Sequence, residues 1–167
     1  MLKLVLLDRD GVLNRELGGY VTNTADLEVL PHVVPNLLRL KTMGCRFVVI
    51  TNQSGIAKSL YTHKGLNEIH QKLVSELEKN GLQLDEIYYC PHHPDFGLCL
   101  CRKPLSSMVE KALARYGVRF DEAVMIGDTM RDVEAAQQAG VGTYKINSNE
   151  NWGWIVDELE VQFSGKQ

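Results

Sequence analysis

An apolar segment that runs into two acidic residues constrains the fold of this 167-residue chain more than any other feature. Leu4 to Leu7 are all apolar and predict a buried strand, which Asp8 and Asp10 follow directly. Residues at positions i and i+2 of an extended chain point the same way, so both carboxylates can address one ligand. Gly11 then permits a tight turn. A solvated acidic turn after a strand is the alternative interpretation.

Apolar runs alternate with amphipathic segments along the rest of the chain. Further strands are expected at residues 47–50, 87–89, 124–126 and 143–146. Helices are expected at residues 33–43, 66–81 and 107–116. A short helix should end at residue 139, and a last one should lie around 152–159. This alternation predicts an α/β fold with a parallel central sheet that is flanked by helices on both faces. The length favours one domain over residues 1–167.

Polar residues stand where several of these strands end. Thr51 and Asn52 follow the second strand, and Asp128 follows the fourth. Because ligands of open α/β sheets bind at the carboxyl ends of the strands, we expect these groups to meet Asp8 at one edge. Two carboxylates there suit Mg²⁺, which prefers oxygen ligands. With the positive charge of Lys103, they describe a site for a phosphoryl group beside a cation.

The two leading acids suit a two-step transfer. An Asp carboxylate can be the nucleophile and form an aspartyl-phosphate, which is the role expected of Asp8. Such a site needs a second acid to protonate the leaving oxygen and later to activate water, and Asp10 is placed for it. Structural alternatives stay open at this point. Asp128 could cap a helix, Asp132 could be a helix-start charge or act near the metal, and Lys103 could be a solvated loop residue.

Three of the four cysteines lie close to histidines. Cys90 is followed by His92 and His93, and Cys99 and Cys101 come a few residues later. Three thiolates and one imidazole can close a tetrahedral zinc site, and a site filled by protein ligands alone would be structural. In a reducing compartment this grouping indicates a metal rather than disulfides. Three buried thiols are the alternative.

The overall composition excludes several classes of protein. A formal net charge of -3 argues against a nucleic-acid-binding protein. No apolar run approaches the length of a membrane span, and the first residues do not resemble a signal peptide, so the expected location is the cytoplasm. Cys45 is interpreted as a small buried apolar residue. His70 has no metal-ligand spacing and is expected at a surface or boundary position on a helix.

The chain resembles, in order along its length, the four motifs of the haloacid dehalogenase superfamily of phosphohydrolases. These motifs are Asp8-x-Asp10-Gly-x-x-Asn14, Thr51-Asn52, Lys103 and Gly127-Asp128-x-x-x-Asp132. The resemblance implies a Rossmann-like fold, with Asp8 as nucleophile and Asp10 as acid and base. It implies that Thr51 and Lys103 bind the phosphoryl group. Asp128, with the backbone carbonyl of Asp10 and the carboxylate of Asp8, would bind Mg²⁺.

The Cys-x-His and Cys-x-Cys pairs are similar to a zinc-containing branch of that superfamily, which includes heptose bisphosphate phosphatases and histidinol-phosphatases. This resemblance favours His92 over His93 as the fourth zinc ligand. The segment from Thr51 to Ala57 looks like the heptose form, because histidinol-phosphatases tend to carry Asp where Ser54 stands. The short loop between His92 and the next cysteine is nearer to the histidinol form.

The resemblance therefore implies removal of the 7-phosphate of D-glycero-D-manno-heptose 1,7-bisphosphate through a phospho-aspartate. Histidinol phosphate is the alternative substrate, and a non-catalytic, zinc-stabilised module that binds phosphorylated ligands is the alternative of another class. The gap between the first two strands leaves no room for an inserted cap domain, so specificity would fall to loops. The residues expected to bind a small phosphorylated sugar are Asn14, Gly19, Tyr20, Asn52, Gln53, Ser54 and Arg102. We expect a monomer.

Overall fold

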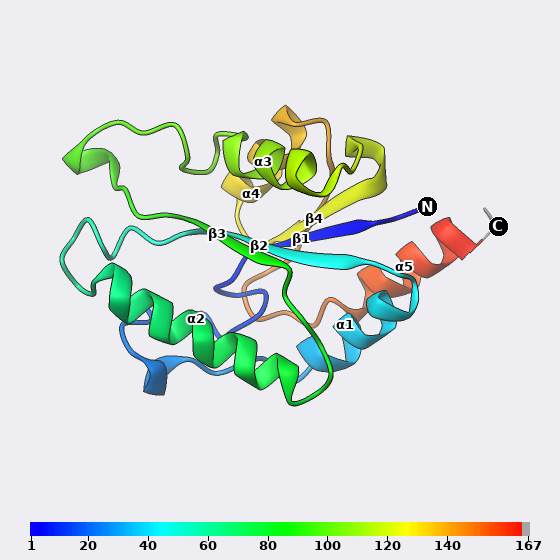
Figure 1. Cartoon of the computed structure of the whole chain (residues 1–167), viewed down its shortest axis with the longest axis horizontal. Coiled ribbons are helices and arrows are strands. Elements are labelled where there is room, and N and C mark those ends of the chain that lie inside the picture. The colour runs from blue at the N-terminus through cyan, green and yellow to red at the C-terminus, as the bar shows by residue number, and fades with distance from the viewer. Residues whose placement is uncertain (165–167) are drawn as a thin grey trace.

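A computed structural model describes residues 1–164 and confirms the α/β fold (Figure 1). Five parallel strands form one sheet in the order β3-β2-β1-β4-β5. The strands are β1 (Leu4–Leu7), β2 (Arg46–Asn52), β3 (Glu86–Cys90), β4 (Ala123–Gly127) and β5 (Gly142–Lys145). The helices are α1 (Val33–Thr42), α2 (His63–Glu78), α3 (Ser107–Tyr116), α4 (Met130–Gln138) and α5 (Gly153–Ser164).

Helices cover both faces of the sheet: α1, α2 and α5 lie on one side and α3 and α4 on the other (Figure 1). Strand β1 is buried along its whole length because it lies in the middle. Its side chains alternate, so that Val5 and Leu7 pack with the first group of helices. Leu4 and Leu6 pack with the second group. A strand buried on both faces reads as a continuous apolar run, which explains why the sequence predicts it correctly.

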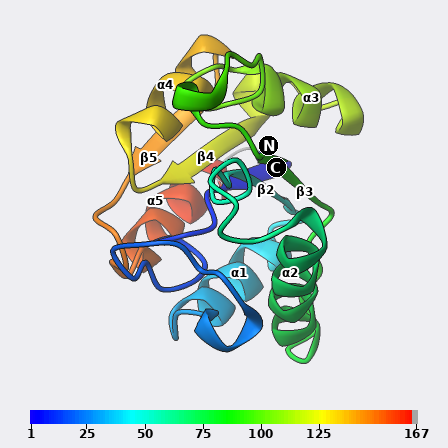
Figure 2. The same ribbon diagram turned by 90° about the vertical axis from the view of Figure 1, so that its left-hand side faces the viewer.

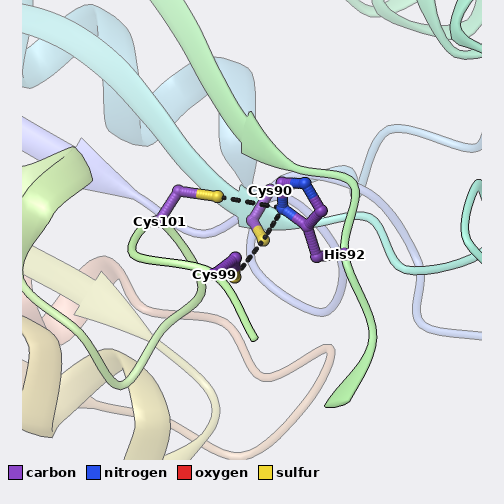
Figure 3. Close-up of side chains that lie close together, drawn as sticks. All are labelled: Cys90, His92, Cys99 and Cys101. Carbon is purple, nitrogen blue, oxygen red and sulfur yellow. Dashed lines mark hydrogen bonds between the residues drawn. The ribbon is translucent and has the colours of Figure 1, made fainter. Parts of the chain in front are cut away.

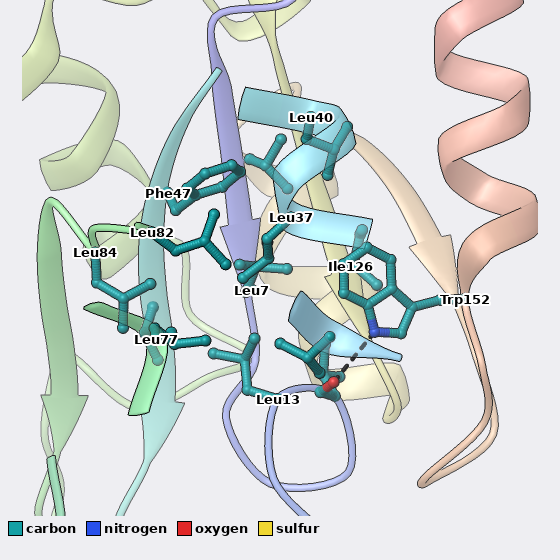
Figure 4. Packing of buried hydrophobic residues seen from close by; sticks show 14 of the residues in the cluster. Leu7, Leu13, Leu37, Leu40, Phe47, Leu77, Leu82, Leu84, Ile126 and Trp152 are labelled. Atoms are coloured by element: carbon teal, nitrogen blue, oxygen red, sulfur yellow. Dashed lines mark hydrogen bonds between the residues drawn. The ribbon is translucent and has the colours of Figure 1, made fainter. Parts of the chain in front are cut away.

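The larger of the two cores lies under α1, α2 and α5 (Figure 4). Leu37 and Leu40 from α1 meet Leu7 and Ile126 from the two central strands there. Trp152, which precedes α5, is fully buried in the same cluster. Burial of apolar surface on this scale stabilises a fold by about 25 cal/mol per Å². This core fixes the central strands, and with them the ends from which the polar loops start.

The structure moves several predicted boundaries, and hydrogen bonds explain two of them. Strand β2 extends to Asn52, because Thr51 and Asn52 pair in parallel register with Tyr89 and Cys90 of β3. Helix α2 begins three residues earlier than its apolar periodicity indicates, since the side chain of Thr62 caps it by accepting a hydrogen bond from the backbone of residue 65. Polar residues at the ends of elements carry little periodicity, so hydrogen bonding decides where an element stops.

All five strands are parallel, and the loops that follow them gather at one end of the molecule (Figure 2). Between β1 and β2 the chain forms only a loop, a 3₁₀ turn at Thr24–Asp26 and helix α1, which agrees with the predicted absence of a cap. Within residues 1–164, none of the helices combines the length and the apolar character that a membrane crossing requires.

Candidate active site and metal centre

Two buried carboxylates and a buried lysine meet at the carboxyl end of the sheet. Lys103 Nζ lies 2.8 Å from Asp8 Oδ1 and 2.5 Å from Asp132 Oδ1. It also donates a hydrogen bond of 2.6 Å to the backbone carbonyl of Ile50. The exposed fractions are 8% for Asp8, 2% for Lys103 and 1% for Asp132. The structure thus brings the predicted nucleophile and the predicted phosphate-binding cation into direct contact.

The end of β2 holds Lys103 in place. Asn52 Nδ2 donates to the carbonyl of Lys103 at 3.0 Å, and the backbone amide of Lys103 donates to Asn52 Oδ1 at 3.0 Å. This reciprocal pair joins residues that lie 51 positions apart in the chain. Asn52 also lines the cavity described below, as expected of a substrate-binding residue. Its amide group, however, is committed to positioning the lysine.

Helix α4 starts at this site with Thr129 as its N-cap, so the alternative that Asp128 caps the helix is wrong. The amide and hydroxyl of Thr129 donate to Asp132 Oδ2 at 2.9 and 2.7 Å. Gly127 makes room for this turn, because a Cβ atom there would lie only 2.2 Å from the Cβ of Asp132. The side chain of Asp128 faces the segment after β5, where it accepts a hydrogen bond from Ser148.

A cluster of three acidic side chains could hold a cation. One carboxylate oxygen each from Asp8, Asp128 and Asp132 lies within 4.8 Å of the others. This donor set consists of oxygen alone, which is what Mg²⁺ and other hard cations prefer. The residues therefore fit the predicted metal. The cluster includes Asp132, whose role the sequence leaves open, while the backbone carbonyl of Asp10 stays a prediction as a ligand.

Burial and neighbouring charges set the protonation states. Burial and the nearby Asp132 raise the pKa of Asp8 to about 7, against the opposing effect of Lys103. Burial alone would lower the pKa of Lys103, but the two carboxylates outweigh it and raise that pKa. Lys103 in turn outweighs burial at Asp132 and lowers the pKa of this acid. Burial raises the pKa of Asp128. Lys103 is therefore a cation at neutral pH, and Asp132 is its permanent counter-charge.

The carboxylate of Asp10 is turned towards a different set of partners. It accepts hydrogen bonds from the guanidinium of Arg9, from Asn14 Nδ2 at 2.9 Å and from Gln53 Nε2 at 2.9 Å. Burial would raise the pKa of Asp10, but Arg9 and these donors lower it. Asn14 is fully buried and contacts Asp10, and its expected contact with substrate stays a prediction. Gln53 also accepts a hydrogen bond of 2.7 Å from Tyr61.

A cavity of about 420 Å³ opens over these groups. All predicted catalytic residues line it, together with every predicted substrate-binding residue except Asn14. At its mouth the hydroxyls of Tyr20 and Ser54 lie 3.2 Å apart, and the ammonium of Lys58 lies over the Tyr20 ring. The lining residues for which the sequence predicted no catalytic, substrate-binding or metal-binding role are Arg9, Glu16, Val21, His93, Thr129, Arg131, Asp132 and Ser148.

The segment before α5 fastens the loop that follows β1. Asn149 has a positive φ of 66°, and its backbone amide donates to the carbonyl of Gly11 at 2.8 Å. Its side chain bonds both the amide and the carbonyl of Glu16, at 2.7 and 3.2 Å. Trp152 Nε1 donates to the carbonyl of Val12 at 3.1 Å (Figure 4). Residues far along the chain therefore hold the loop that carries the first two acids.

The three remaining cysteines and His92 form a second cluster (Figure 3). Cys90 Sγ lies 3.7 Å from Cys99 Sγ and 3.5 Å from His92 Nδ1, which is 3.3 Å from Cys101 Sγ. A tetrahedral ion with sulfur at about 2.3 Å and nitrogen at about 2.0 Å would space its ligands by about 3.8 Å between sulfurs and about 3.5 Å between sulfur and nitrogen. The observed distances fit such an ion.

The two histidines have different surroundings, and one of them connects the Cys/His cluster to the acidic one. His92 points into the thiol group, whereas His93 caps the turn after it by accepting from the amide of Asp95 at 3.2 Å. Arg102 Nη1 donates to the carbonyl of His92 at 3.0 Å. Lys103 follows directly, so the Cys/His loop ends in the cation that contacts Asp8.

Comparison with known proteins decides the family. The sequence model of a family described as haloacid dehalogenase-like hydrolase matches residues 2–140. This chain belongs to that family. Among the similar proteins is the D-glycero-beta-D-manno-heptose-1,7-bisphosphate 7-phosphatase of Bordetella bronchiseptica, which is 38% identical over 147 residues, or 88% of this chain and 82% of the relative. The Escherichia coli protein of the same name is 37% identical over 83% of this chain and 75% of the relative.

A solved structure resembles this haloacid dehalogenase-like hydrolase across almost its whole length. It is the D,D-heptose 1,7-bisphosphate phosphatase from B. bronchiseptica complexed with magnesium and phosphate. It has a TM-score of 0.89 and 32% identity, and the match covers 96% of this chain and 99% of the other. A relative from Photorhabdus laumondii named for the alpha anomer of the same substrate is 32% identical over 84% of this chain and 79% of the relative.

Proposed function

We propose that this haloacid dehalogenase-like hydrolase is a magnesium-dependent phosphatase that removes the 7-phosphate of D-glycero-D-manno-heptose 1,7-bisphosphate. The observation that carries the proposal is the contact of 2.8 Å between Asp8 and Lys103, inside a cavity that also contains Asp10 and the acidic cluster. A nucleophile, a proton donor and a cation thereby face one space. The names of the most similar proteins support the choice of substrate.

The first step joins the phosphoryl group to the protein. A carboxylate oxygen of Asp8 attacks phosphorus, and the bond from phosphorus to the sugar oxygen breaks. Its neighbours lower the pKa of Asp10, so Asp10 takes up a proton from solvent before this step. It then gives that proton to the sugar oxygen, and the sugar leaves as an alcohol. Lys103 and Thr51 hold the phosphoryl oxygens. Their fixed positions stabilise the charge of the transition state without reorganisation.

The second step restores the protein. Asp10, now ionised, takes a proton from water, and the water oxygen attacks the phosphorus of phospho-Asp8. The bond between phosphorus and the Asp8 oxygen breaks, which releases inorganic phosphate and regenerates the carboxylate. The hydrogen bonds from Arg9, Asn14 and Gln53 stabilise the ionised form of Asp10 that this step needs.

Asp8 and Asp128 would hold Mg²⁺ together with the carbonyl of Asp10, and Asp132 stands beside them. When bound, Mg²⁺ supplies positive charge that neutralises the phosphoryl oxygens and polarises the phosphorus. A neighbouring divalent charge also favours ionised carboxylates, so it opposes the effect of burial on Asp8.

The Cys/His cluster would hold Zn²⁺ through Cys90, His92, Cys99 and Cys101. All four tetrahedral positions are then filled by protein, which makes the site structural. Its role would be to order the loop that ends in Arg102 and Lys103. The support for zinc is the ligand set and its spacing, given above.

The sugar would lie at the cavity mouth, among Gly19, Tyr20, Ser54 and Arg102. These residues offer hydroxyl groups and a cation for the part of the substrate that does not react. We infer that the partner is this small molecule rather than a nucleic acid or a membrane. A monomer, a single domain over residues 1–167 and a cytoplasmic location stay predictions.

A steady-state comparison of substrates tests the proposal. Phosphate release with Mg²⁺ present is measured for the alpha and beta anomers of the heptose bisphosphate and for histidinol phosphate. We expect the highest kcat/KM for a heptose anomer and a product that keeps its 1-phosphate, as read by phosphorus NMR. A higher kcat/KM for histidinol phosphate would make that compound the substrate in place of the heptose bisphosphate. No release from any of the three compounds would indicate a binding module instead.

A further inference from the structure

Arg9 is a buried charge for which the four family motifs give no role. Its side chain is 1% exposed, although arginine is rarely buried without partners. The guanidinium reaches both oxygens of Asp10: Nη2 lies 2.9 Å from Oδ1 and 3.0 Å from Oδ2, and Nε lies 3.2 Å from Oδ1. Asn14 and Gln53 bond one oxygen each. Of these three donors, only the planar fork of Arg9 binds both oxygens and so fixes the plane of the carboxylate.

The third nitrogen of the fork has a partner on another element. Arg9 Nη1 lies 3.3 Å from Nε2 of His70, in helix α2. Arginine has no acceptor, so Nε2 must accept, which requires a neutral ring with its proton on Nδ1. Burial, followed by the charge of Arg9, lowers the pKa of His70 to about 3, which agrees with a neutral ring. The ring is 7% exposed and lies edge-on to Tyr89, with centroids 5.7 Å apart.

We propose that Arg9 and His70 are positioning residues that hold the carboxylate of Asp10 where it protonates the leaving sugar oxygen. This inference rests on the proposed function. The fork can rotate about its bonds unless each nitrogen is held, and His70 supplies the acceptor that holds Nη1. The chain of contacts thus runs from the rigid helix α2 through Arg9 to Asp10. A displacement of about 1 Å in a reacting group is enough to reduce a rate by about 10²-fold.

The leaving group provides a readout that a merely structural role would not move. A sugar oxygen must be protonated as it leaves, whereas 4-nitrophenolate is stable as an anion and needs no proton. The ratio kcat/KM covers only the steps up to release of the leaving group. It therefore excludes the hydrolysis of phospho-Asp8, in which Asp10 acts for both substrates. A misplaced Asp10 should lower kcat/KM for the sugar substrate selectively.

The experiment compares Arg9→Met, His70→Leu and His70→Gln with the unchanged protein, in full-length chains loaded with metal. For the heptose bisphosphate, we expect Arg9→Met to lower kcat/KM by about 10²-fold and His70→Leu by about 10-fold. For 4-nitrophenyl phosphate, we expect both losses to stay below about 5-fold, because leaving-group protonation is not needed. His70→Gln should restore most of the loss, because its side-chain oxygen can accept from Arg9.

Two surface substitutions serve as controls for this series. The first is Arg119→Met and the second is His63→Leu, on the same helix as His70. Neither should change kcat/KM for either substrate. Equal losses for both substrates, with no rescue by His70→Gln, would overturn the positioning role. If Arg9→Met does not fold, the pair of His70 variants decides. An unchanged protein that releases no phosphate from either compound would instead overturn the proposed function.

Discussion

The two candidate metal centres of this molecule are built in opposite ways. Asp8, Asp128 and Asp132 come from the ends of central strands and the start of a helix, and they are buried or half-buried. The Cys/His cluster comes from one stretch of 12 residues, 90–101, in which only Cys90 is buried. Leu98 and Leu100, inside that stretch, are 100% and 84% exposed. The first centre is held by a packed sheet, and the second has little packing around it.

The contrast in packing indicates which centre depends on its ion for an ordered shape. The acidic cluster keeps its geometry through Lys103, which forms ion pairs with two carboxylates, and through the turn of Thr129. The Cys/His loop has few apolar contacts that could order it, so a metal would supply most of that order. Because the loop ends at Lys103, the two centres share one residue. Disturbing one centre should therefore reach the other through that lysine.

The largest effect is expected from the predicted nucleophile. Asp8→Asn removes the attacking oxygen charge and should lower kcat for the heptose bisphosphate by about 10⁴-fold or more, while the Cys/His centre keeps its metal. Phosphate release and metal content, measured on the same sample, check both parts. Asp121→Asn, at an exposed position, is the control. Turnover near that of the unchanged protein would refute the assignment of Asp8 as the nucleophile, and with it the catalytic role of the acidic cluster.

Lys103→Met should have the next largest effect, because this residue belongs to both regions. It removes the cation that holds the phosphoryl group, so kcat should fall by about 10²–10³-fold. It also leaves Asp8 and Asp132 without their shared counter-charge, which should lower the free energy of unfolding by about 3–5 kcal/mol without Mg²⁺. Urea unfolding with and without Mg²⁺ measures this loss, with Lys64→Met as the control. A stability unaffected by the substitution would show that the sheet alone holds the carboxylates.

The Cys/His centre should affect turnover less than the acidic one. Cys99→Ser should reduce bound zinc from about one ion per chain to almost none and lower kcat/KM by about 10–100-fold, through the displaced Lys103. Cys45→Ser, outside the cluster, should keep both zinc and activity. Elemental analysis with kinetics on both variants makes the measurement. Full activity in a zinc-free and folded Cys99→Ser protein would break the proposed connection between the centres.

The smallest effect is a loss of folding stability at acidic pH, which should occur even without bound metal. The pKa of His70 is about 3 in the folded protein and about 6.5 when exposed, so the unfolded chain binds the proton first as the pH falls. The stabilisation by neutral His70 is complete above pH 6.5 and is lost towards pH 3, at up to about 1.4 kcal/mol per pH unit. Thermal unfolding with a chelator at pH 7 and pH 5 measures it. If His70→Gln loses as much stability as the unchanged protein over this range, the histidine is not the cause.

The centre of the sheet could be predicted from the sequence because each strand shows its burial in its own residues. A strand buried on both faces must be apolar throughout, and a parallel sheet brings the ends of such strands together. Asp8, Thr51 and Asp128 were therefore expected at one edge, and the structure places all three around one cavity. The grouping of three cysteines with a histidine could be predicted from their spacing, and the resemblance to a family favours His92. Their role as zinc ligands stays a prediction.

The support around Asp10 could not be predicted in this way. Arg9 and His70 lie 61 residues apart, and neither shows its burial by a pattern. His70 was expected at a surface or boundary position, which is wrong, because it faces a buried guanidinium rather than water. The full burial of Asn14 likewise depends on tertiary packing and could not be predicted from its neighbours in the sequence. Contacts between polar groups in a core leave no periodic trace in a sequence.

The clasp formed by Asn149 and Trp152 has a consequence for exchanging parts between relatives. Both residues lie beyond position 140, where the family match ends, yet they grip the backbone at Gly11, Val12 and Glu16. In a chimera that takes its last strand and helix from a related protein, the residues that bind the first loop would come from that protein and would not match the loop. Such hybrids should work only when the first loop is transplanted together with the last strand and helix, as one inseparable module.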